Sequence, residues 1–369
     1  MSATIDIDGS MLEGGGQLVR NAVAYAALLS KSIKIYNIRD NRKPKGLKWQ
    51  HAAGVRLAGQ ISNATLQGCS VGSREILFSP GEINTSRHYL ADPTTAGSIT
   101  LLLQIALPCL IFSRASSSPS CNVTLRGGTN VPHSPPIDYT QRIFLPFIHR
   151  HFGIDPVLQI HKRGFAPKGG GEVHYSMSPT HGPLPPLTLL ERGDVVVVQG
   201  FAYVAGIRRS LAETMAGIAK ATLISGGIDP NIINVDVFEE PRQNCPAGIC
   251  SGVFLTATTT GGCTLAGSAY GKGAEIVVAA AANELLQNLD HGGCVDEYLQ
   301  DQMIIFLALA KGRSAVRCGP LSLHTKTAIW IAETLSDAKF TVEIDGKITT
   351  ISCDGIGYTG FSSDDNAVN

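Results

Sequence analysis

A histidine stands where an apolar strand meets an apolar helix, within the segment GPLSLHTKTAIWIAETL at residues 319–335. His324 has no second histidine, cysteine or carboxylate within several residues on either side. An imidazole there can serve as a nucleophile, because covalent catalysis divides one difficult displacement into two easier ones. It can equally be a helix-start residue that hydrogen-bonds the backbone, since most histidines are not catalytic. The segment alone leaves both interpretations open.

Three consecutive glycines end a strand and open a helix in DGSMLEGGGQLVR, residues 8–20. Backbone N–H groups in such a turn can approach an anion, which the helix N-terminus also favours. Glu13 could hold a divalent cation on that anion, and Arg20 lies two turns into the helix. The alternative is a tight packing turn, because the segment matches neither a Walker A loop nor GxGxxG.

Positive charge gathers in NIRDNRKPKGLKWQH, residues 37–51, in an otherwise neutral chain. Its cations are Arg39, Arg42, Lys43, Lys45 and Lys48, and Gln50 and His51 stand at the start of the next helix. Guanidinium groups bind phosphate bidentately, and functional residues gather on loops. The loop is therefore a candidate phosphate site, with an ordinary solvated loop as the alternative.

The segment VDEYLQDQ, residues 295–302, begins a helix predicted to run through VDEYLQDQMIIFLALA. Tyr298, Asp301 and Gln302 have the i, i+3 and i+4 spacing that puts side chains on one helix face. That face could grip a nucleoside, although acids in a first turn are also ordinary helix capping. A further segment, GSAYGKGA at 267–274, is one residue short of a Walker A loop and is predicted to be a hairpin.

The composition is that of a globular protein with a large core: of 369 residues, 44% are hydrophobic and 16% are charged. Lys plus Arg and Asp plus Glu both number 30, which argues against a protein that coats nucleic acid non-specifically. A local basic patch could still recognise one nucleic-acid end. The 9 cysteines are scattered singly, which makes a disulfide framework or zinc site improbable and favours a reducing compartment.

Neither a secretion signal nor a membrane span is expected. The N-terminus MSATIDIDGS lacks a basic start and an apolar core. The apolar stretch AGSITLLLQIALPCLIF contains Gln104 and Pro108 and is too short to span a bilayer. We expect a soluble intracellular protein.

Hydrophobic periodicity predicts the element order β-α-β-α-β-β from the N-terminus, again from residue 88, and a third time at the C-terminus. About a hundred residues of different order interrupt the third copy. The expected fold is α/β (α+β), with three repeated βαβαββ units in one large domain and a smaller α/β domain inserted in the third repeat. The expected boundaries are 1–194 and 291–369 for the large domain and 195–290 for the inserted one.

Five segments in this order resemble RNA 3′-terminal phosphate cyclase: EGGGQ, NVPHSPPIDYT, RGFAPKGGGEV, HGGCVDEYLQDQ and GPLSLHTKTAIWIAE. The resemblance runs nearly end to end, and RG-x-x-PKGGGEV is similar to the signature of that family. It implies the same repeat-plus-insert architecture. It also implies a ligase-type nucleotidyl transfer in which the histidine at the place of His324 attacks the α-phosphorus of ATP and carries AMP. AMP then passes to an RNA 3′-phosphate, and the ribose 2′-hydroxyl closes a 2′,3′-cyclic phosphate.

The resemblance also assigns site residues. The ATP-contacting positions are Gln104, Pro135, Tyr298, Asp301, Gln302 and His324. Glu13 matches a metal-binding acid near the triphosphate, so ATP and Mg²⁺ (or Mn²⁺) are the expected co-substrate and cofactor. Positions that grip the RNA end or the triphosphate are Arg20, Arg39, Arg42, Gln50 and His51.

Two other functions are compatible with related folds. A cyclase-like branch of the superfamily serves in ribosome assembly, but it departs at the histidine and at EGGGQ, both intact here. A carboxyvinyl transferase built from similar repeats is not supported, because the cyclase signatures are present in this sequence. The expected partners are ATP and RNA 3′-phosphate ends, with no membrane and no obligate protein partner; the expected location is the nucleus, with the cytosol as the alternative.

Overall fold

The computed structural model describes residues 3–84, 87–112, 121–180, 182–245 and 248–360. The first repeat consists of β1 (Ile5–Asp8), α1 (Gly16–Leu28), β2 (Ile33–Tyr36), α2 (Trp49–Ile61), β3 (Thr65–Gln67) and β4 (Ile76–Ser79). The second consists of β5 (His88–Ala91), α3 (Ile99–Ile111), β6 (Cys121–Gly127), α4 (Ile137–Tyr139), a π-helical turn (Thr140–Phe144), α5 (Leu145–Phe152), β7 (Pro156–Lys162) and β8 (Gly171–Met177). The third consists of β9 (Thr188–Leu189), α8 (Glu297–Gln302), α9 (Ile304–Leu309), β14 (Lys311–Cys318), α10 (Leu323–Leu335), β15 (Lys339–Asp345) and β16 (Ile348–Ile356).

The three repeats form sheets of one topology. Their strand orders are β1-β2-β4-β3, β5-β6-β8-β7 and β9-β14-β16-β15. In each sheet the first two strands are parallel, because a helical crossover joins them, and the remaining pairings are antiparallel. The expected α/β fold of three βαβαββ units is confirmed.

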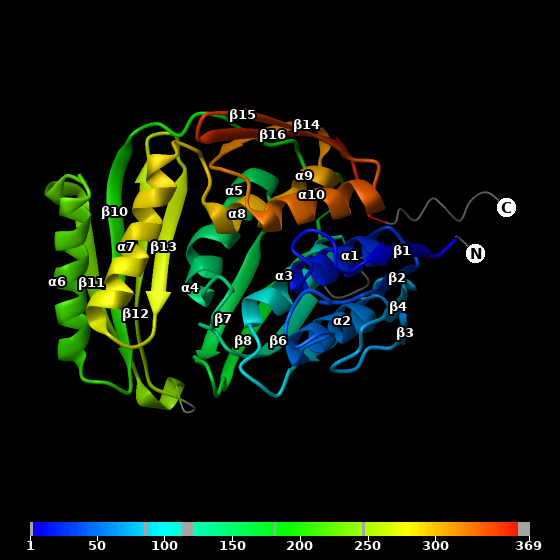
Figure 1. Ribbon diagram of the computed structural model, residues 1–369, viewed down its shortest axis with the longest axis horizontal. Coiled ribbons are helices and arrows are strands. Elements are labelled where there is room, and N and C mark those ends of the chain that lie inside the picture. Colours follow the sequence, from blue (N-terminus) through cyan, green and yellow to red (C-terminus); the bar gives the residue numbers. More distant parts are fainter. Residues whose placement is uncertain (1–2, 85–86, 113–120, 181, 246–247, 361–369) are drawn as a thin grey trace.

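A fourth unit, which we call the insert, lies between β9 and α8, inside the crossover of the third repeat (Figure 1). It consists of β10 (Val195–Ala205), α6 (Arg209–Ser225), a 3₁₀ turn (Pro230–Ile232), β11 (Ile233–Glu240), a second 3₁₀ turn (Arg242–Asn244), β12 (Cys250–Thr259), β13 (Thr264–Tyr270) and α7 (Ala274–Asp290). Its sheet has the order β11-β10-β12-β13, and α6 and α7 pack on one face. The domain boundaries at residues 195 and 290 stay a prediction.

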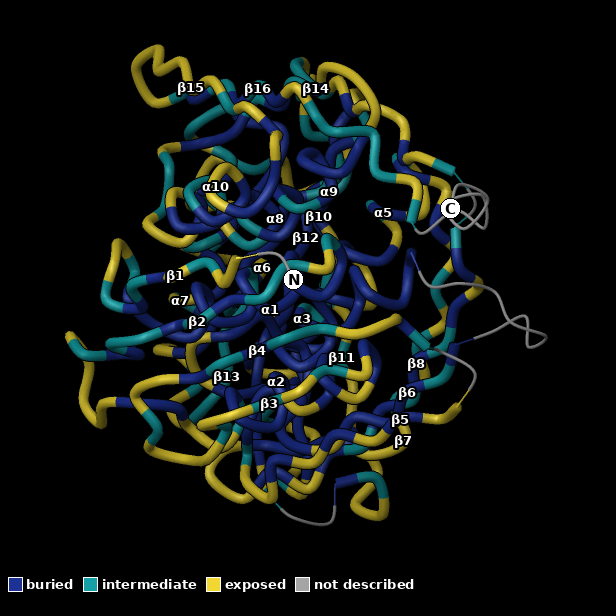
Figure 2. Tube along the Cα trace, turned by 90° about the vertical axis from the view of Figure 1, so that its right-hand side faces the viewer, coloured by how far each residue is buried: buried dark blue, intermediate teal, exposed yellow. Residues whose placement is uncertain are grey.

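Helices of all three repeats meet in one core. Every residue of α1 except Asn21 is buried, as expected for a helix with apolar residues all round. It packs on α2, α3 and α10. Figure 2 shows the buried tube gathered around α1 and α3, with exposed segments at the periphery. The insert has a separate core between its sheet and its two helices.

Two expected elements differ from the structure. The helix predicted through residues 295–310 is broken at Met303, where an i→i+3 bond from the Phe306 N–H to the Met303 carbonyl separates α8 from α9. The hairpin predicted at 267–274 is wrong. That segment is the end of β13 and the turn into α7, where Gly271 and Gly273 have φ values of 139° and 85°.

Within the described residues, no helix combines the length and apolar character needed to cross a membrane. All nine cysteines are free thiols, and eight of them are buried. Burial raises the pKa of several of these thiols, Cys109 and Cys353 among them, to about 12.

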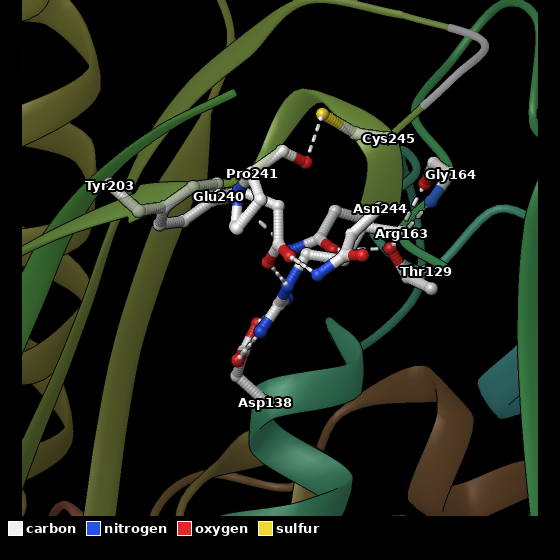
Figure 3. Close-up of polar contacts among 10 residues, drawn as sticks. Thr129, Asp138, Arg163, Gly164, Tyr203, Glu240, Pro241, Asn244 and Cys245 are labelled. Atoms are coloured by element: carbon white, nitrogen blue, oxygen red, sulfur yellow. Dashed lines mark hydrogen bonds and ion pairs between the residues drawn. The ribbon is translucent and has the colours of Figure 1, made fainter. Parts of the chain in front are cut away.

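The insert is joined to the second repeat through a buried arginine (Figure 3). The Arg163 guanidinium donates to both carboxylate oxygens of Asp138 at 2.7 and 2.8 Å. Its Nε donates to Glu240 Oε2 at 2.7 Å. The three side chains are 9%, 2% and 8% exposed. One guanidinium therefore bonds two buried carboxylates, and both depend on the same cation.

We predict that Arg163→Ala lowers the free energy of unfolding by about 3–5 kcal/mol, because two buried carboxylates lose their cation. The matched control is Arg209→Ala, which breaks the exposed i,i+4 pair with Glu213 and should cost less than about 0.5 kcal/mol. Urea unfolding of both variants measures the difference. Equal small losses would contradict the structural role of Arg163.

Candidate active site

The glycine turn of the first repeat lies against α10 of the third. The Glu13 N–H donates to Thr327 Oγ1 at 3.1 Å, a contact between residues 314 positions apart. Thr327 Oγ1 in turn donates to the Leu323 carbonyl at 2.8 Å. Because residues three apart on a helix share a face, the turn is brought to the side of α10 that carries His324.

The loop before α10 is held by one buried glutamine. Gln300 Nε2 donates to the carbonyls of Gly319 and Pro320 at 3.2 and 3.3 Å. Its Oε1 accepts from the Ser322 N–H at 3.0 Å and from Thr325 Oγ1 at 2.6 Å. Gln300 is 2% exposed. These four bonds set the direction in which α10 begins and therefore the position of His324.

His324 is the second residue of α10, after the N-cap Ser322, whose hydroxyl accepts from the Thr325 N–H. Its side chain is exposed. Desolvation lowers the pKa of His324, and Arg20 and Arg42 lower it further, while Glu13 and Glu297 oppose the shift. A helix N-terminus also disfavours a cation. The net shift favours the neutral imidazole, the state in which it can attack an electrophile.

The glycines let charged side chains approach the turn. A side chain at residue 15 would collide with the carboxylate of Glu13, and one at residue 16 with the ring of His51. Arg42 Nη2 donates to the carbonyl of Glu13 at 2.9 Å and to its Oε1 at 3.3 Å. Glu13 Oε2 is buried without a hydrogen-bond partner in the described part of the chain. The turn therefore presents one free carboxylate oxygen.

Two arginines beside this turn are buried with few counter-charges. Arg20 and Arg39 are 9% and 8% exposed. Arg20 Nη2 has a 3.4 Å bond to Gln17 Oε1, and Arg39 Nη2 a 3.4 Å bond to the Pro44 carbonyl, while Arg39 Nε is buried without a partner. Burial lowers the pKa of both, and nearby Glu13 opposes the shift. Under-compensated buried cations are favourable surroundings for an anion.

The side chain of His51 lies against the glycine turn, and that of its neighbour Gln50 lies against the start of α3. Gln50 Oε1 accepts from the Ser98 N–H at 3.0 Å, which leaves its NH₂ group to donate. His51 Nδ1 accepts from the Lys48 N–H at 3.2 Å, so the proton of a neutral ring lies on Nε2. Desolvation and the nearby cations Arg20, Arg39 and Lys48 lower the pKa of His51 to about 3. Both side chains are suited to bind an anion as neutral donors.

The residues expected to contact ATP are brought together only in part. Gln104, Asp301 and Gln302 line one cavity of about 30 Å³, which has room for little more than ordered water. Burial raises the pKa of Asp301 to about 7. Tyr298 packs edge-on against Tyr139, with ring centroids 5.3 Å apart. Pro135 lies apart from this cavity, where its carbonyl accepts from Thr100.

Comparison with known proteins identifies the family of this chain. A family model described as RNA 3′-terminal phosphate cyclase matches residues 11–342. A probable RNA 3′-terminal phosphate cyclase of Dictyostelium discoideum is 42% identical over 98% of this chain and 84% of its own. The RNA 3′-terminal phosphate cyclases of Staphylothermus marinus and Drosophila melanogaster are 38% and 35% identical, over 89% and 96% of this chain and 91% and 97% of their own. The chain belongs to the RNA 3′-terminal phosphate cyclase family.

This membership confirms the resemblance seen in the five sequence segments and makes the chain an enzyme of the cyclase family. The structure adds residues that the sequence pattern did not indicate. Gln300 lies between Tyr298 and Asp301, yet its role depends on a loop about twenty residues away. A cavity of about 420 Å³ also opens beside the start of α10, lined by His291, Glu297, Gln300 and Ser322 among others. No local pattern indicated it.

A metal ion in this cyclase-family site would take few protein ligands. In the described ranges of the chain, no three His, Cys, Asp or Glu side chains cluster in a way that could hold a metal. The free Oε2 of Glu13 can supply one ligand. Mg²⁺ is commonly held by one or two carboxylates together with substrate phosphates and water, so the residues present fit such an ion.

We predict that His51 makes the cyclase-family fold acid-sensitive. The pKa falls from its ordinary 6.5 to about 3 in the folded chain, so between these values the unfolded state binds the extra proton. Protonation of His51 therefore favours the unfolded state, and the free energy of unfolding falls as the pH drops below 6.5, by up to about 2 kcal/mol at pH 5. His51→Gln should lose less stability than the wild type between pH 7.5 and 5 in urea unfolding. His149→Gln, at an exposed histidine, is the control, and a matching loss in His51→Gln and wild type would contradict the prediction.

Proposed function

We propose that this chain converts an RNA 3′-terminal phosphate into a 2′,3′-cyclic phosphodiester at the expense of ATP, through AMP carried on His324. The observation that carries the proposal is the exposed imidazole at the start of α10, whose pKa is lowered by desolvation and by the nearby guanidinium groups of Arg20 and Arg42. A nucleophile next to under-compensated cations suits an attack on a polyphosphate, whose charge those cations would balance.

In the first step an imidazole nitrogen of His324 bonds to the α-phosphorus of ATP as the bond from that phosphorus to the bridging oxygen breaks. Pyrophosphate leaves with the electron pair, and AMP stays on the ring as a phosphoramidate. The lowered pKa of His324 keeps the attacking lone pair free. The expected ATP-contacting positions Gln104, Pro135, Tyr298, Asp301 and Gln302 remain part of this proposal.

Glu13 is the residue proposed to hold Mg²⁺. Its Oε1 is engaged by Arg42, and its buried Oε2 is free to coordinate. A bound Mg²⁺ would neutralise charge on the phosphates as pyrophosphate departs. Without a cation, the carboxylate would repel the triphosphate, so Glu13 also makes nucleotide binding depend on the metal.

In the later steps an oxygen of the RNA 3′-phosphate attacks the phosphorus of AMP, and His324 leaves as the free imidazole. The product is an RNA end joined to AMP by a pyrophosphate bond. The neighbouring ribose 2′-hydroxyl then attacks the RNA phosphorus, loses its proton, and expels AMP. We assign the terminal phosphate to the guanidinium of Arg42, to the donors of Arg39 and His51 near the glycine turn, and to Gln50, whose side chain lies against the start of α3. The nuclear location of the enzyme stays a prediction.

His324→Asn should leave the fold intact and abolish labelling of the protein by ATP that carries the label on its α-phosphate. The bond to the wild-type protein should be broken by acid and survive alkali, as expected of a phosphoramidate. His149→Asn, the same change at an exposed histidine, should label normally. Labelling of His324→Asn at the wild-type level would overturn the assignment of the nucleophile.

Glu13→Ala should impair self-labelling chiefly by weakening the use of metal, so that raised Mg²⁺ or added Mn²⁺ recovers part of the loss. We expect at least about a tenfold lower rate at low Mg²⁺, equivalent to about 1.4 kcal/mol. A metal titration of the labelling rate measures it, with Glu75→Ala, at an exposed surface pair, as the control. Normal labelling at low Mg²⁺ would favour a purely structural turn.

A further inference from the structure

A cavity of about 490 Å³ opens between the insert sheet and the second repeat, and none of its lining residues belongs to the site described above. One wall is formed by β10–β13 and the other by Arg142 and Arg163. Its volume lies within the range of ligand sites. A neighbouring cavity of about 90 Å³ shares Arg142 and Thr264 and adds Arg150 from α5. We call the two together the insert groove.

Strand alternation explains why this face of the sheet is open. Val198, Ala202 and Val204 of β10 point into the core beneath α6 and α7, so the residues between them point to the opposite face. On that face Phe201 and Phe254 form a buried floor. Figure 1 shows α4 on this side of the insert sheet, away from α6.

Beyond the aromatic floor the face carries amides. Gln199 and Asn234 are register partners on β10 and β11, and both side chains are exposed. Asp236 and Phe238 follow on β11, with Phe238 39% exposed at the sheet edge. Amides supply donors and acceptors side by side, and an exposed aromatic ring offers a stacking surface; this combination suits the edge and face of an unpaired base.

The opposite wall carries guanidinium groups without counter-charges. The Arg142 guanidinium lies 4.8 Å from the centre of the Phe201 ring, and Arg142 has no carboxylate partner among the residues that the structure describes. Arg150 Nη1 donates to the Gly262 carbonyl at 2.9 Å, also with no acid in the described ranges. Arg163, by contrast, is neutralised by its two carboxylates. Arg150 follows Arg142 by eight positions of helical chain, roughly 12 Å along the axis.

The groove adjoins the proposed nucleotide site. Arg163 in the groove wall is paired with Asp138 (Figure 3). The next residue, Tyr139, packs its ring against that of Tyr298. Gln302 Nε2 donates to the Tyr298 carbonyl at 2.8 Å. One layer of side chains therefore separates the groove from the residues expected to contact ATP.

We propose that the insert groove binds the single-stranded RNA that precedes the terminal phosphate. Arg142 and Arg150 bind backbone phosphates, Phe238 stacks with a base, and Gln199 and Asn234 hydrogen-bond base edges. The proposal rests on the proposed function, because a cyclase must hold a strand whose end reaches His324. Stacking surfaces combined with cations along a groove are the usual means of binding single strands.

Direct binding tests the groove without catalysis. The probe is a fluorescein-labelled RNA decamer with a 3′-hydroxyl end, followed by fluorescence anisotropy at fixed salt. Arg142→Ala combined with Phe238→Ala should raise the Kd by about tenfold or more and reduce its dependence on salt. Arg209→Ala, which removes an exposed arginine from α6, should stay within about twofold of the wild type. An unchanged Kd in the double variant would overturn the proposal and leave a protein segment as the occupant of the groove.

A second measurement separates this proposal from the catalytic one. With a decamer that ends in 3′-phosphate, the double variant should show a raised KM at unchanged kcat, with normal self-labelling by ATP. With a dinucleotide 3′-phosphate, too short to reach the groove, its KM should equal that of the wild type. Equal losses on both substrates would contradict a groove that holds only the upstream strand. Tight groove-dependent binding by a wild-type protein that forms no cyclic product would support the groove and refute the cyclase proposal.

Discussion

The contact between the glycine turn and α10 is the interaction on which the candidate active site depends. A hydrogen bond from the Glu13 N–H to Thr327 Oγ1 lies where the glycine turn of the first repeat touches the third. Packing of α1 on α10 holds the two elements together along their length. Because Glu13 and His324 lie close together on the two sides of this contact, a shift of α10 would separate the imidazole from the carboxylate. Gln300 limits such a shift by bonding both sides of the loop that precedes the helix.

Charge in the site follows from that packing. Arg20 extends from a helix that is almost wholly buried, so its guanidinium is buried as well. Desolvation of a cation is unfavourable unless an anion accompanies it. Asp301 supplies one partner, but burial raises its pKa to about 7, so near neutral pH it carries only part of a charge. In the proposed function, a bound phosphate group would remove the remaining imbalance.

The insert is attached differently from the repeats. The three βαβαββ units share one apolar core, which Phe201, Tyr203 and Phe254 from one face of the insert sheet also join, whereas the other face of that sheet has a core of its own beneath α6 and α7. Its link to the second repeat includes the buried Arg163 with Asp138 and Glu240, together with Tyr203, whose hydroxyl accepts from Asn130. Such polar contacts require defined geometry, which fixes the angle between insert and repeat. The insert groove is open because only part of the sheet face is covered at that angle.

The sequence by itself determined the order of elements, the threefold repeat, the family and the place of His324 at a helix start. These features follow from hydrophobic periodicity, from glycine turns and from short motifs, each of which can be identified within a short segment of the sequence. Glu13 beside its glycines and the cations of residues 37–51 could be identified in the same way. The break at Met303 and the strand-to-helix turn at 267–274 differ from the predicted elements, because a local pattern does not fix where a helix ends or a strand turns.

Only the tertiary structure decided which of these residues meet. It brought Glu13 against Thr327, which is 314 positions away in the sequence. It directed the side-chain carbonyl of Gln50 toward the Ser98 N–H, and it left Pro135 outside the small cavity that Gln104 lines. It also made Gln300 the residue that orients α10 and left the face of Gln199 and Asn234 uncovered. The physical reason is that contacts between distant elements depend on the angle and register at which helices and sheets pack. Many side chains determine these together, and no single segment of the sequence contains them.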